Sequence, residues 1–297
     1  MVRFSIADHI IEWQGEGVKE LADQTPNYPR FYTTDSDARP RMRLCFDGEV
    51  TPPATEPLLT HDYDLAEGRC TLRYYKECYL LTLWSGDERF SATLLCPTAE
   101  GAESEPLYTY HTNFPTSAPE WRYLLDHLMV FAYSLATLNA RTLLIHSSTI
   151  VHSERGAMFL GESGTGKSTH TRLWLKHIED CRLLNDDGPI IRTDRPTPRV
   201  YGSPWSGKTH CYNNQSVELA AMVRLRQAPY NRITRQATIT AFGALLPSCL
   251  PTLQKRERDL DEICATLSEL LAKVPIHLLE CLPDEDAART SHKAIFG

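Results

Sequence analysis

The pattern of hydrophobic and polar positions divides the chain into two parts near residue 118. In the first part, short apolar and β-branched runs alternate with clusters of turn-forming residues, as in strands joined by short connections. The expected strands cover residues 41–46, 70–75, 79–84, 90–95 and 107–111. The pattern predicts a small antiparallel sheet, so residues 1–118 are expected to form a β-rich N-terminal domain.

In the second part, residues 119–297, predicted strands and helices alternate, as is typical of an α/β domain. Residues 113–119 contain two prolines and are expected to form a linker. Leucine and phenylalanine recur at helical spacing over residues 120–139, which predicts a helix with one buried face. The strands expected after it are 142–151, 157–160, 181–184, 217–225 and 276–279, and the helices are 167–178, 234–246 and 257–272.

A glycine-rich octet lies between the expected strand 157–160 and the expected helix 167–178. It reads Gly-Glu-Ser-Gly-Thr-Gly-Lys-Ser and is a complete phosphate-binding loop. Its glycines allow backbone N–H groups to surround an anion, Lys167 can reach the terminal phosphates of ATP, and Ser168 can hold Mg²⁺. The alternative is a turn that matches by chance. The predicted nucleotide-binding residues are Gly161, Ser163, Gly164, Thr165, Gly166, Lys167, Ser168 and Thr169.

A second octet, Gly-Ser-Pro-Trp-Ser-Gly-Lys-Thr at residues 202–209, has the same spacing. Pro204 has no N–H to offer a phosphate, and the residues that follow are poor helix formers. We therefore expect no second nucleotide site. Trp205, Ser206 and Lys208 indicate instead a substrate or active-site loop, with a plain surface hairpin as the alternative.

Two acids and a histidine complete the candidate chemistry. Asp186 and Asp187 follow the apolar run 181–184, the usual place for acids that face the metal in a phosphate-loop protein. One could accept a hydroxyl proton while the other holds Mg²⁺, or the pair could form a solvated turn. His146 lies in an apolar run and could contact phosphate or orient an acid, although a lone histidine there is more often a hydrogen-bonded core residue.

Composition excludes several classes of protein. The net charge of −7 and the absence of a long basic run argue against nucleic-acid binding. The longest apolar stretch, residues 128–138, is too short to cross a bilayer, so no membrane partner is expected. Nine cysteines without a C-x-x-C pair or zinc-like spacing are typical of reduced thiols, and we expect a cytoplasmic protein. Homo-oligomer formation is left open.

These motifs together resemble the catalytic domain of HPr serine kinases and their relatives in the phosphoenolpyruvate carboxykinase-like group. The resemblance rests on Leu-Ile-His-Ser-Ser around His146, a hairpin at 153–156, the octet 161–168 and Leu-Leu-Asn-Asp-Asp at 183–187, with a similar closing segment at 279–284. It covers residues 120–297 and is strongest from His146 to Asp187. It implies a P-loop kinase domain over residues 119–297.

The resemblance also implies roles for individual residues. The family's histidine assists at the active site, its lysine and serine bind phosphate and metal, and its acids provide a general base and a metal contact. By position these are His146, Lys167, Ser168, Asp186 and Asp187. The family's usual order makes Asp186 the base and Asp187 the metal ligand.

The chain also departs from that family. Thr169 stands where HPr kinases carry an acid, and the octet 202–209 replaces their glycine-rich, arginine-containing loop. Carboxykinases are considerably longer and carry further metal and oxaloacetate motifs. These departures leave open both the acceptor and any dephosphorylation.

The sequence therefore predicts a Mg²⁺-dependent kinase that transfers the ATP γ-phosphoryl group to a hydroxyl, first of all a serine of a protein or peptide. One alternative is a kinase of a free small molecule such as an amino acid or sugar, and another is a slow nucleotide-binding regulatory module. Arg224 and Arg226, two apart on one strand face, could hold an anionic substrate, with two exposed arginines on an edge strand as the alternative.

Overall fold

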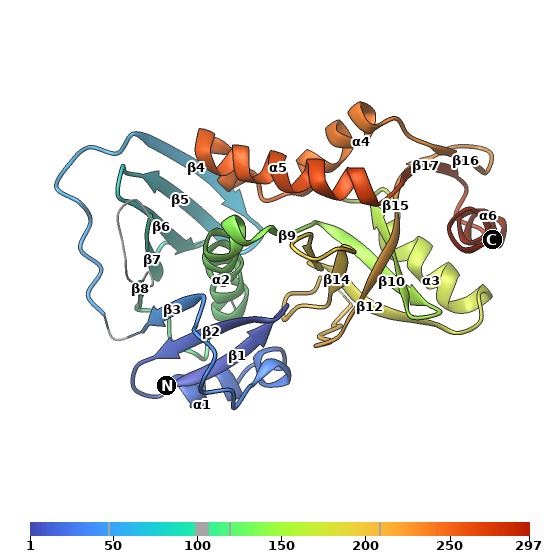
Figure 1. Cartoon of the computed structure of the whole chain (residues 1–297). Coiled ribbons are helices and arrows are strands. Elements are labelled where there is room, and N and C mark those ends of the chain that lie inside the picture. Colours follow the sequence, from blue (N-terminus) through green and yellow to red (C-terminus); the bar gives the residue numbers. More distant parts are fainter. Residues whose placement is uncertain (47, 99–106, 119, 208) are drawn as a thin grey trace. The chain divides into compact units, whose positions relative to one another are not determined.

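Contacts in the computed structural model divide the chain into two compact units, Met1–Ala136 and Thr137–Gly297 (Figure 1). The structure describes residues 1–46, 48–98, 107–118, 120–207 and 209–297. Each unit contains its own sheet and its own helices. The prediction of a mixed α/β protein with a β-rich N-terminal part is confirmed at this level.

The described part of the first unit contains an eight-stranded sheet in the order β1-β2-β3-β8-β7-β6-β5-β4. Most neighbours are antiparallel, but β2 and β8 both run parallel to β3, so the expected small antiparallel sheet is wrong in size and partly in direction. The strands are β1 (Val2–Ile6), β2 (His9–Gln14), β3 (Met42–Cys45), β4 (Leu59–Leu65), β5 (Gly68–Tyr74), β6 (Cys78–Ser85), β7 (Ser91–Pro97) and β8 (Leu107–Thr112).

The β1–β2 hairpin was missed because its turn lacks the usual sequence signature. Ala7 and Asp8 occupy the turn with φ values of 48° and 60°, a backbone region in which glycine and asparagine are the common residues. The unit also contains the short helices α1 (Val18–Asp23) and η1 (Tyr28–Phe31).

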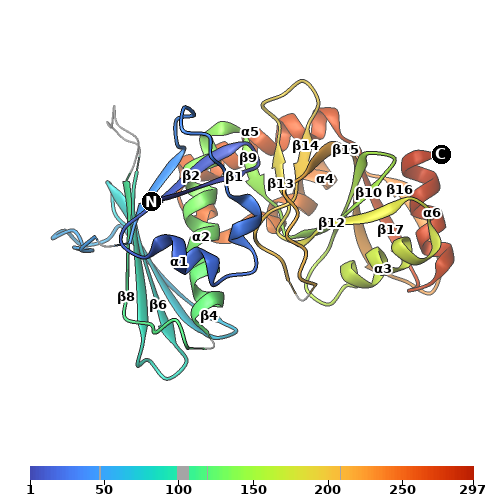
Figure 2. The same ribbon diagram turned by 90° about the horizontal axis from the view of Figure 1, so that it is seen from below.

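Helix α2 (Trp121–Thr137) packs within the first unit, beside its sheet (Figure 2). Asp126 accepts hydrogen bonds from Asn27 and Tyr28, and Phe131 meets the ring of Tyr79 edge-on. Because one face of this helix completes the core of the first unit, the division falls at residue 136 and not at the expected 118.

The second unit is built on a nine-stranded sheet among the described residues, with β12-β10-β11-β15-β14-β13-β9 in spatial order. Strand β17 pairs with residues 222–227 of β15 and with β16, and β15 runs parallel to both β11 and β17. The strands are β9 (Thr142–Leu144), β10 (Ser147–His152), β11 (Arg155–Leu160), β12 (Cys181–Asp187), β13 (Ile190–Arg192), β14 (Arg199–Tyr201), β15 (Ser216–Gln227), β16 (Arg232–Arg235) and β17 (Ile276–Cys281).

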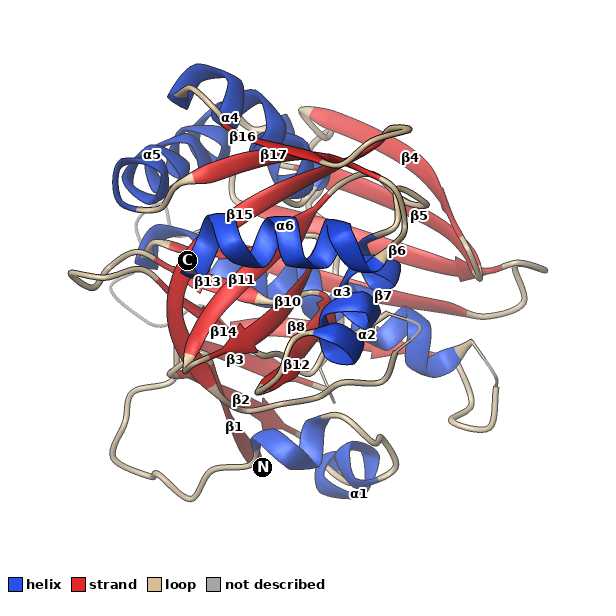
Figure 3. Cartoon of the chain, turned by 90° about the vertical axis from the view of Figure 1, so that its right-hand side faces the viewer, coloured by secondary structure: helices blue, strands red, loops and turns tan. Residues whose placement is uncertain are grey.

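Helices α3 and α6 lie together against one face of this sheet (Figure 3). The core there includes Phe159 of β11, Trp174 of α3, Val223 of β15 and Ala288 of α6, all of them fully buried. The helical segments of the unit are η2 (Leu138–Ala140), α3 (Lys167–His177), α4 (Thr238–Leu245), η3 (Leu246–Ser248), η4 (Pro251–Lys255), α5 (Glu257–Lys273) and α6 (Glu285–Phe296).

Two expected elements of the second unit are different in the structure. The strand expected over 142–151 is interrupted, because β9 pairs with β13 whereas β10 pairs with β11 and β12. At the interruption Ile145 bridges Cys249, and the His146 N–H donates to the carbonyl of Ser248. The helix expected from residue 234 begins only at Thr238, because residues 232–235 pair with β17 as a strand.

Candidate nucleotide and phosphoryl-transfer site

The first octet joins β11 to α3 in a tightly turned loop. Gly161, Gly164 and Gly166 have φ values of 155°, 82° and 107°, which side chains other than glycine rarely tolerate. The Thr165 hydroxyl donates to the carbonyl of Glu162 at 2.6 Å and closes the turn. Helix α3 begins at Lys167, directly after the loop. The backbone N–H groups of its first turn have no partner within the helix and therefore lie at the end of the loop.

Lys167 is buried at the base of the loop, where its side chain joins the octet to His146. Its Nζ donates to the carbonyl of Gly161 at 2.8 Å and lies 2.8 Å from Nε2 of His146. Burial lowers the pKa of Lys167, and it also lowers the pKa of His146, an effect that Asp187 opposes. A neutral His146 accepting from the Lys167 ammonium through Nε2 carries its own proton on Nδ1.

Asp186 lies inside the site, next to the first helical turn of α3. Strand β12 extends beyond the expected 181–184 and pairs Asp186 with Ser148 of β10. The Asp186 side chain is buried, and the Ser168 hydroxyl is 3.3 Å from each of its carboxylate oxygens. This arrangement brings together two oxygen ligands of the kind that Mg²⁺ prefers.

Asp187 lies at the exposed edge of the same site. Half of its side chain remains accessible, and its Oδ1 is 3.6 Å from Nε2 of His146. Its φ of 114° is unfavourable for a residue with a Cβ. A bridge to Ser206 and the hydrogen bond from the Gly207 N–H to the Asp186 carbonyl hold this conformation in place.

The second octet reaches the site without forming a phosphate loop. No helix begins at residues 209–215, where the structure describes an irregular segment. Trp205 is buried, the Ser206 hydroxyl donates to the Asp186 carbonyl at 2.9 Å, and Lys208 lies outside the described residues. Together with the hydrogen bond from the Gly207 N–H, this contact fixes the described part of the octet to the backbone of Asp186.

Asn185 is a positioning residue that the sequence alone did not identify. Its side-chain amide donates to the carbonyl of Trp205 at 3.0 Å, and its oxygen accepts from the Gly188 N–H at 2.9 Å. It thus fixes the second-octet loop to the end of β12. Its position directly before Asp186 and Asp187 was the sequence feature that could have indicated this role.

The hydroxyl of Ser168 and the carboxylate of Asp186 are donors that fit a magnesium ion. Ser168 and Asp186 can hold the ion, whereas the Thr169 hydroxyl accepts a hydrogen bond from Arg172 at 3.3 Å. Ser148, which faces Asp186 across the strand pair, has a buried hydroxyl without a partner among the described residues, and such groups commonly bind ordered water. Within the described ranges no group of three or more His, Cys, Asp or Glu side chains forms a metal site, so phosphate and water oxygens would complete the coordination.

A cavity of about 250 Å³ opens beside the first octet. Arg224 on β15 is among its lining residues, together with His146 and the side chains that begin the octet. Strand β15 is paired on both sides, so the alternative of two arginines on an edge strand is wrong. Arg224 and Arg226 also differ in their ion pairing, because Arg226 forms an ion pair with Glu280 at 2.5 Å. The lining residues are His146, Gly161, Glu162, Ser163, Arg224, Gly243, Ala244, Pro247 and Ser248.

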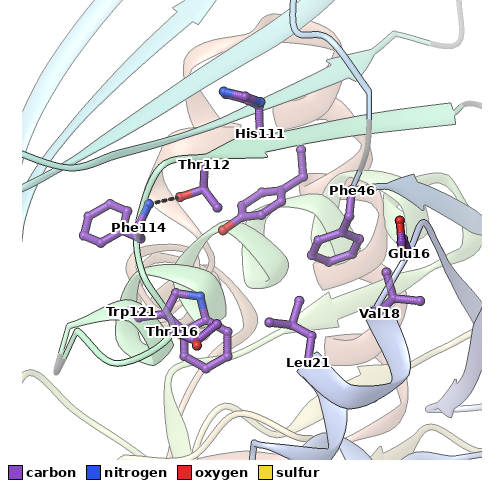
Figure 4. Close-up of a pocket in the computed structure, with 11 residues that line it drawn as sticks. Glu16, Val18, Leu21, Phe46, His111, Thr112, Phe114, Thr116 and Trp121 are labelled. Carbon is purple, nitrogen blue, oxygen red and sulfur yellow. Dashed lines mark hydrogen bonds between the residues drawn. The ribbon is translucent and has the colours of Figure 1, made fainter.

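A second cavity, of about 460 Å³, lies within the first unit (Figure 4). Aromatic rings of Phe46, Tyr110, Phe114 and Trp121 surround it, and Thr112 caps the backbone N–H of Phe114 at 3.0 Å. None of the predicted site residues lines this cavity. Its rings come from distant parts of the sequence, so no local sequence pattern predicted this cavity.

Comparison with known proteins gives no family for this chain. No protein-family model matches it, and no curated protein matches its sequence. Among the helices in the described part of the chain, none has the length and apolar character needed to cross a membrane.

Proposed function

We propose that this chain is a P-loop kinase that transfers the γ-phosphoryl group of ATP to a hydroxyl group. The observation that carries the proposal is the convergence, within the second unit, of Lys167, the Ser168–Asp186 pair and the His146–Asp187 pair around one loop. Pure nucleotide binding does not need a base beside the phosphate loop. The finer assignment of this unit to an HPr kinase-like fold is part of the proposal and rests on the resemblance of the motifs.

The loop and Lys167 would bind the phosphates of ATP. The N–H groups at the start of α3 face the anion, and the Lys167 ammonium exchanges its contacts with Gly161 and His146 for phosphate oxygens. Ser168 and Asp186 would hold Mg²⁺. When bound, the ion neutralises phosphate charge and fixes the orientation of the terminal phosphates.

Asp187 is the better candidate for the general base. It is accessible, whereas Asp186 is buried against Ser168, so an incoming hydroxyl can reach the carboxylate of Asp187. The hydroxyl oxygen forms a bond to the γ-phosphorus as the bond to the β–γ bridging oxygen breaks. The proton passes to Asp187, and the electron pair leaves with ADP. These contacts favour Asp187 as the base and Asp186 as the metal ligand, whereas the resemblance implied the reverse assignment.

The size of the adjoining cavity favours a small-molecule acceptor. Its volume of about 250 Å³ lies below the range of roughly 300–1,000 Å³ typical of pockets for drug-sized ligands. A protein serine, which the sequence put first, would need an open approach to Asp187. We therefore propose a small hydroxylated acceptor and keep the protein serine as the alternative that the experiment distinguishes.

The test is transfer of label from γ-labelled ATP to a cell lysate separated into protein and small-molecule fractions. The Lys167→Ala variant should lower transfer by at least about 100-fold, the scale for loss of one preorganised contact to developing charge. Lys176→Ala, at the other end of α3, is the matched control and should transfer label like the wild type. Near wild-type transfer by Lys167→Ala would overturn the site. ATP binding without transfer to either fraction would favour a binding module.

A further inference from the structure

Arg224 is a positively charged residue at the cavity beside the proposed site. On β15 it pairs in register with Leu160, the last residue before the phosphate loop, and it lines the cavity that also contains His146. Among the described residues Arg224 forms no ion pair, whereas Arg226, two positions further along the strand, is held with Arg232 by Glu280. The difference between two arginines on one strand identifies Arg224 as the one available to a ligand.

The cavity limits the charge of that ligand. Arg224 can bind a carboxylate through paired N–H donors. Glu162 lines the same cavity and forms no ion pair with any described residue, so it would repel a second negative charge. A doubly charged anion, such as a phosphorylated sugar, is therefore disfavoured, and an acceptor with one carboxylate is favoured.

We propose that this cavity binds the phosphoryl acceptor and that the acceptor is a small hydroxy acid. Arg224 holds its carboxylate, and its hydroxyl is directed toward the His146–Asp187 pair. The cavity contains both His146 and Arg224, so one small molecule can meet both. The inference rests on the proposed kinase function and adds the chemical class of the acceptor.

A charge-matched panel of hydroxyl compounds tests the proposal in a coupled assay of ADP release. Glycerate carries one carboxylate, L-serine adds an ammonium group, ethanolamine has only the ammonium group, glycerol is uncharged, and glycerol 3-phosphate is doubly charged. The wild type should phosphorylate glycerate or L-serine in preference to the other three. L-serine preferred over glycerate would further assign the acceptor's ammonium group to Glu162.

Three variants then distinguish a specific contact between Arg224 and the acceptor from a general effect of positive charge on the KM. Arg224→Ala should raise the KM for the preferred hydroxy acid about 10- to 100-fold, the loss expected for a hydrogen bond to a charged group, and should leave the KM for ATP unchanged. Arg224→Lys should recover part of that loss. Arg226→Ala, which removes the same charge from the same strand, should leave both KM values near those of the wild type.

The outcomes distinguish this inference from the kinase proposal. Unchanged acceptor KM in Arg224→Ala would overturn the inference, as would preference for glycerol or glycerol 3-phosphate. Label in the protein fraction together with no turnover of any panel member would also overturn it, while leaving the kinase function intact. A protein that binds no ATP in calorimetry would remove the kinase proposal itself. Circular dichroism of each variant confirms folding before the comparison.

Discussion

His170 offers a test of how helix α3, which follows the first octet, is anchored, independent of any substrate. It lies on α3, one turn after Lys167, and it is almost fully buried. Its Nε2 accepts a hydrogen bond from the indole N–H of Trp174 at 3.2 Å and lies 3.0 Å from the Ser291 hydroxyl. Burial lowers the pKa of His170 from 6.5 to about 4. The side chain is therefore neutral in the folded protein near neutral pH.

The sign of the pH dependence follows from that shift. The unfolded chain takes up a proton on this histidine as the pH falls through about 6.5, whereas the folded chain does so only near 4. The contribution of His170 to folding stability is therefore fully present above the unfolded pKa of 6.5. It is lost as the pH falls from that value to the folded pKa of about 4. At about 1.4 kcal/mol for each pKa unit, the contribution lost between roughly pH 7 and pH 5 is about 2 kcal/mol. Most carboxylates stay ionised over this interval.

Native-state hydrogen exchange of the α3 amides measures this loss in the second unit. The free energy of opening should decrease more steeply on acidification in the wild type than in His170→Gln, by about 2 kcal/mol over the interval. Ser291→Ala is the matched control. It removes a hydrogen-bond partner and should lower stability by about 1 kcal/mol at every pH, but it leaves His170 buried and the slope unchanged. A His170→Gln variant with the full wild-type slope would refute the reasoning.

The remaining predictions concern the acids and the cavity. Asp187→Asn should lower turnover by about 10²- to 10⁴-fold with ATP binding retained, because it removes the proposed base, whereas Asp186→Asn should raise the Mg²⁺ concentration needed for half-maximal activity. Metal titrations of both variants check this, and the reverse pattern would restore the order implied by the family resemblance. Gly243→Ala adds a methyl group to α4 that meets no atom within 4 Å. It should stabilise the protein by up to about 1 kcal/mol in chemical denaturation and raise the acceptor KM by narrowing the cavity, and unchanged stability would contradict the helix argument.

The parts of the site that depend on local sequence could be predicted. The octet 161–168 lies between a strand and a helix as expected, because its glycines, the apolar run before it and the helix-forming run after it each act over a few residues. The ends of α5 were also close to the expected residues 257–272, since a regular apolar stripe defines a helix without help from the rest of the fold.

The different environments of the two acids could not be read from the sequence. Asp186 and Asp187 are neighbours of the same residue type, and only the pairing of β12 with β10 buries the first against Ser168. The boundary of the first unit was misplaced for a similar reason. Helix α2 has an apolar face that either unit could have covered, and contacts such as Phe131 with Tyr79 are non-local.

Two glycines of the second octet occupy positions that close backbone packing requires. A Cβ on Gly202 would collide with the carbonyl of Asn213, so this glycine allows two backbone segments to approach closely. A Cβ on Gly207 would lie 3.1 Å from the Cβ of Asp187 and 3.3 Å from its carboxyl carbon. Gly207 therefore leaves space for the side chain of Asp187. The bridge between Ser206 and Asp187 holds Asp187 at its positive φ. Identical spacing thus occurs in two different loops of one unit: the first octet leads directly into helix α3, whereas the second contacts the backbone of Asp186 through Ser206 and Gly207.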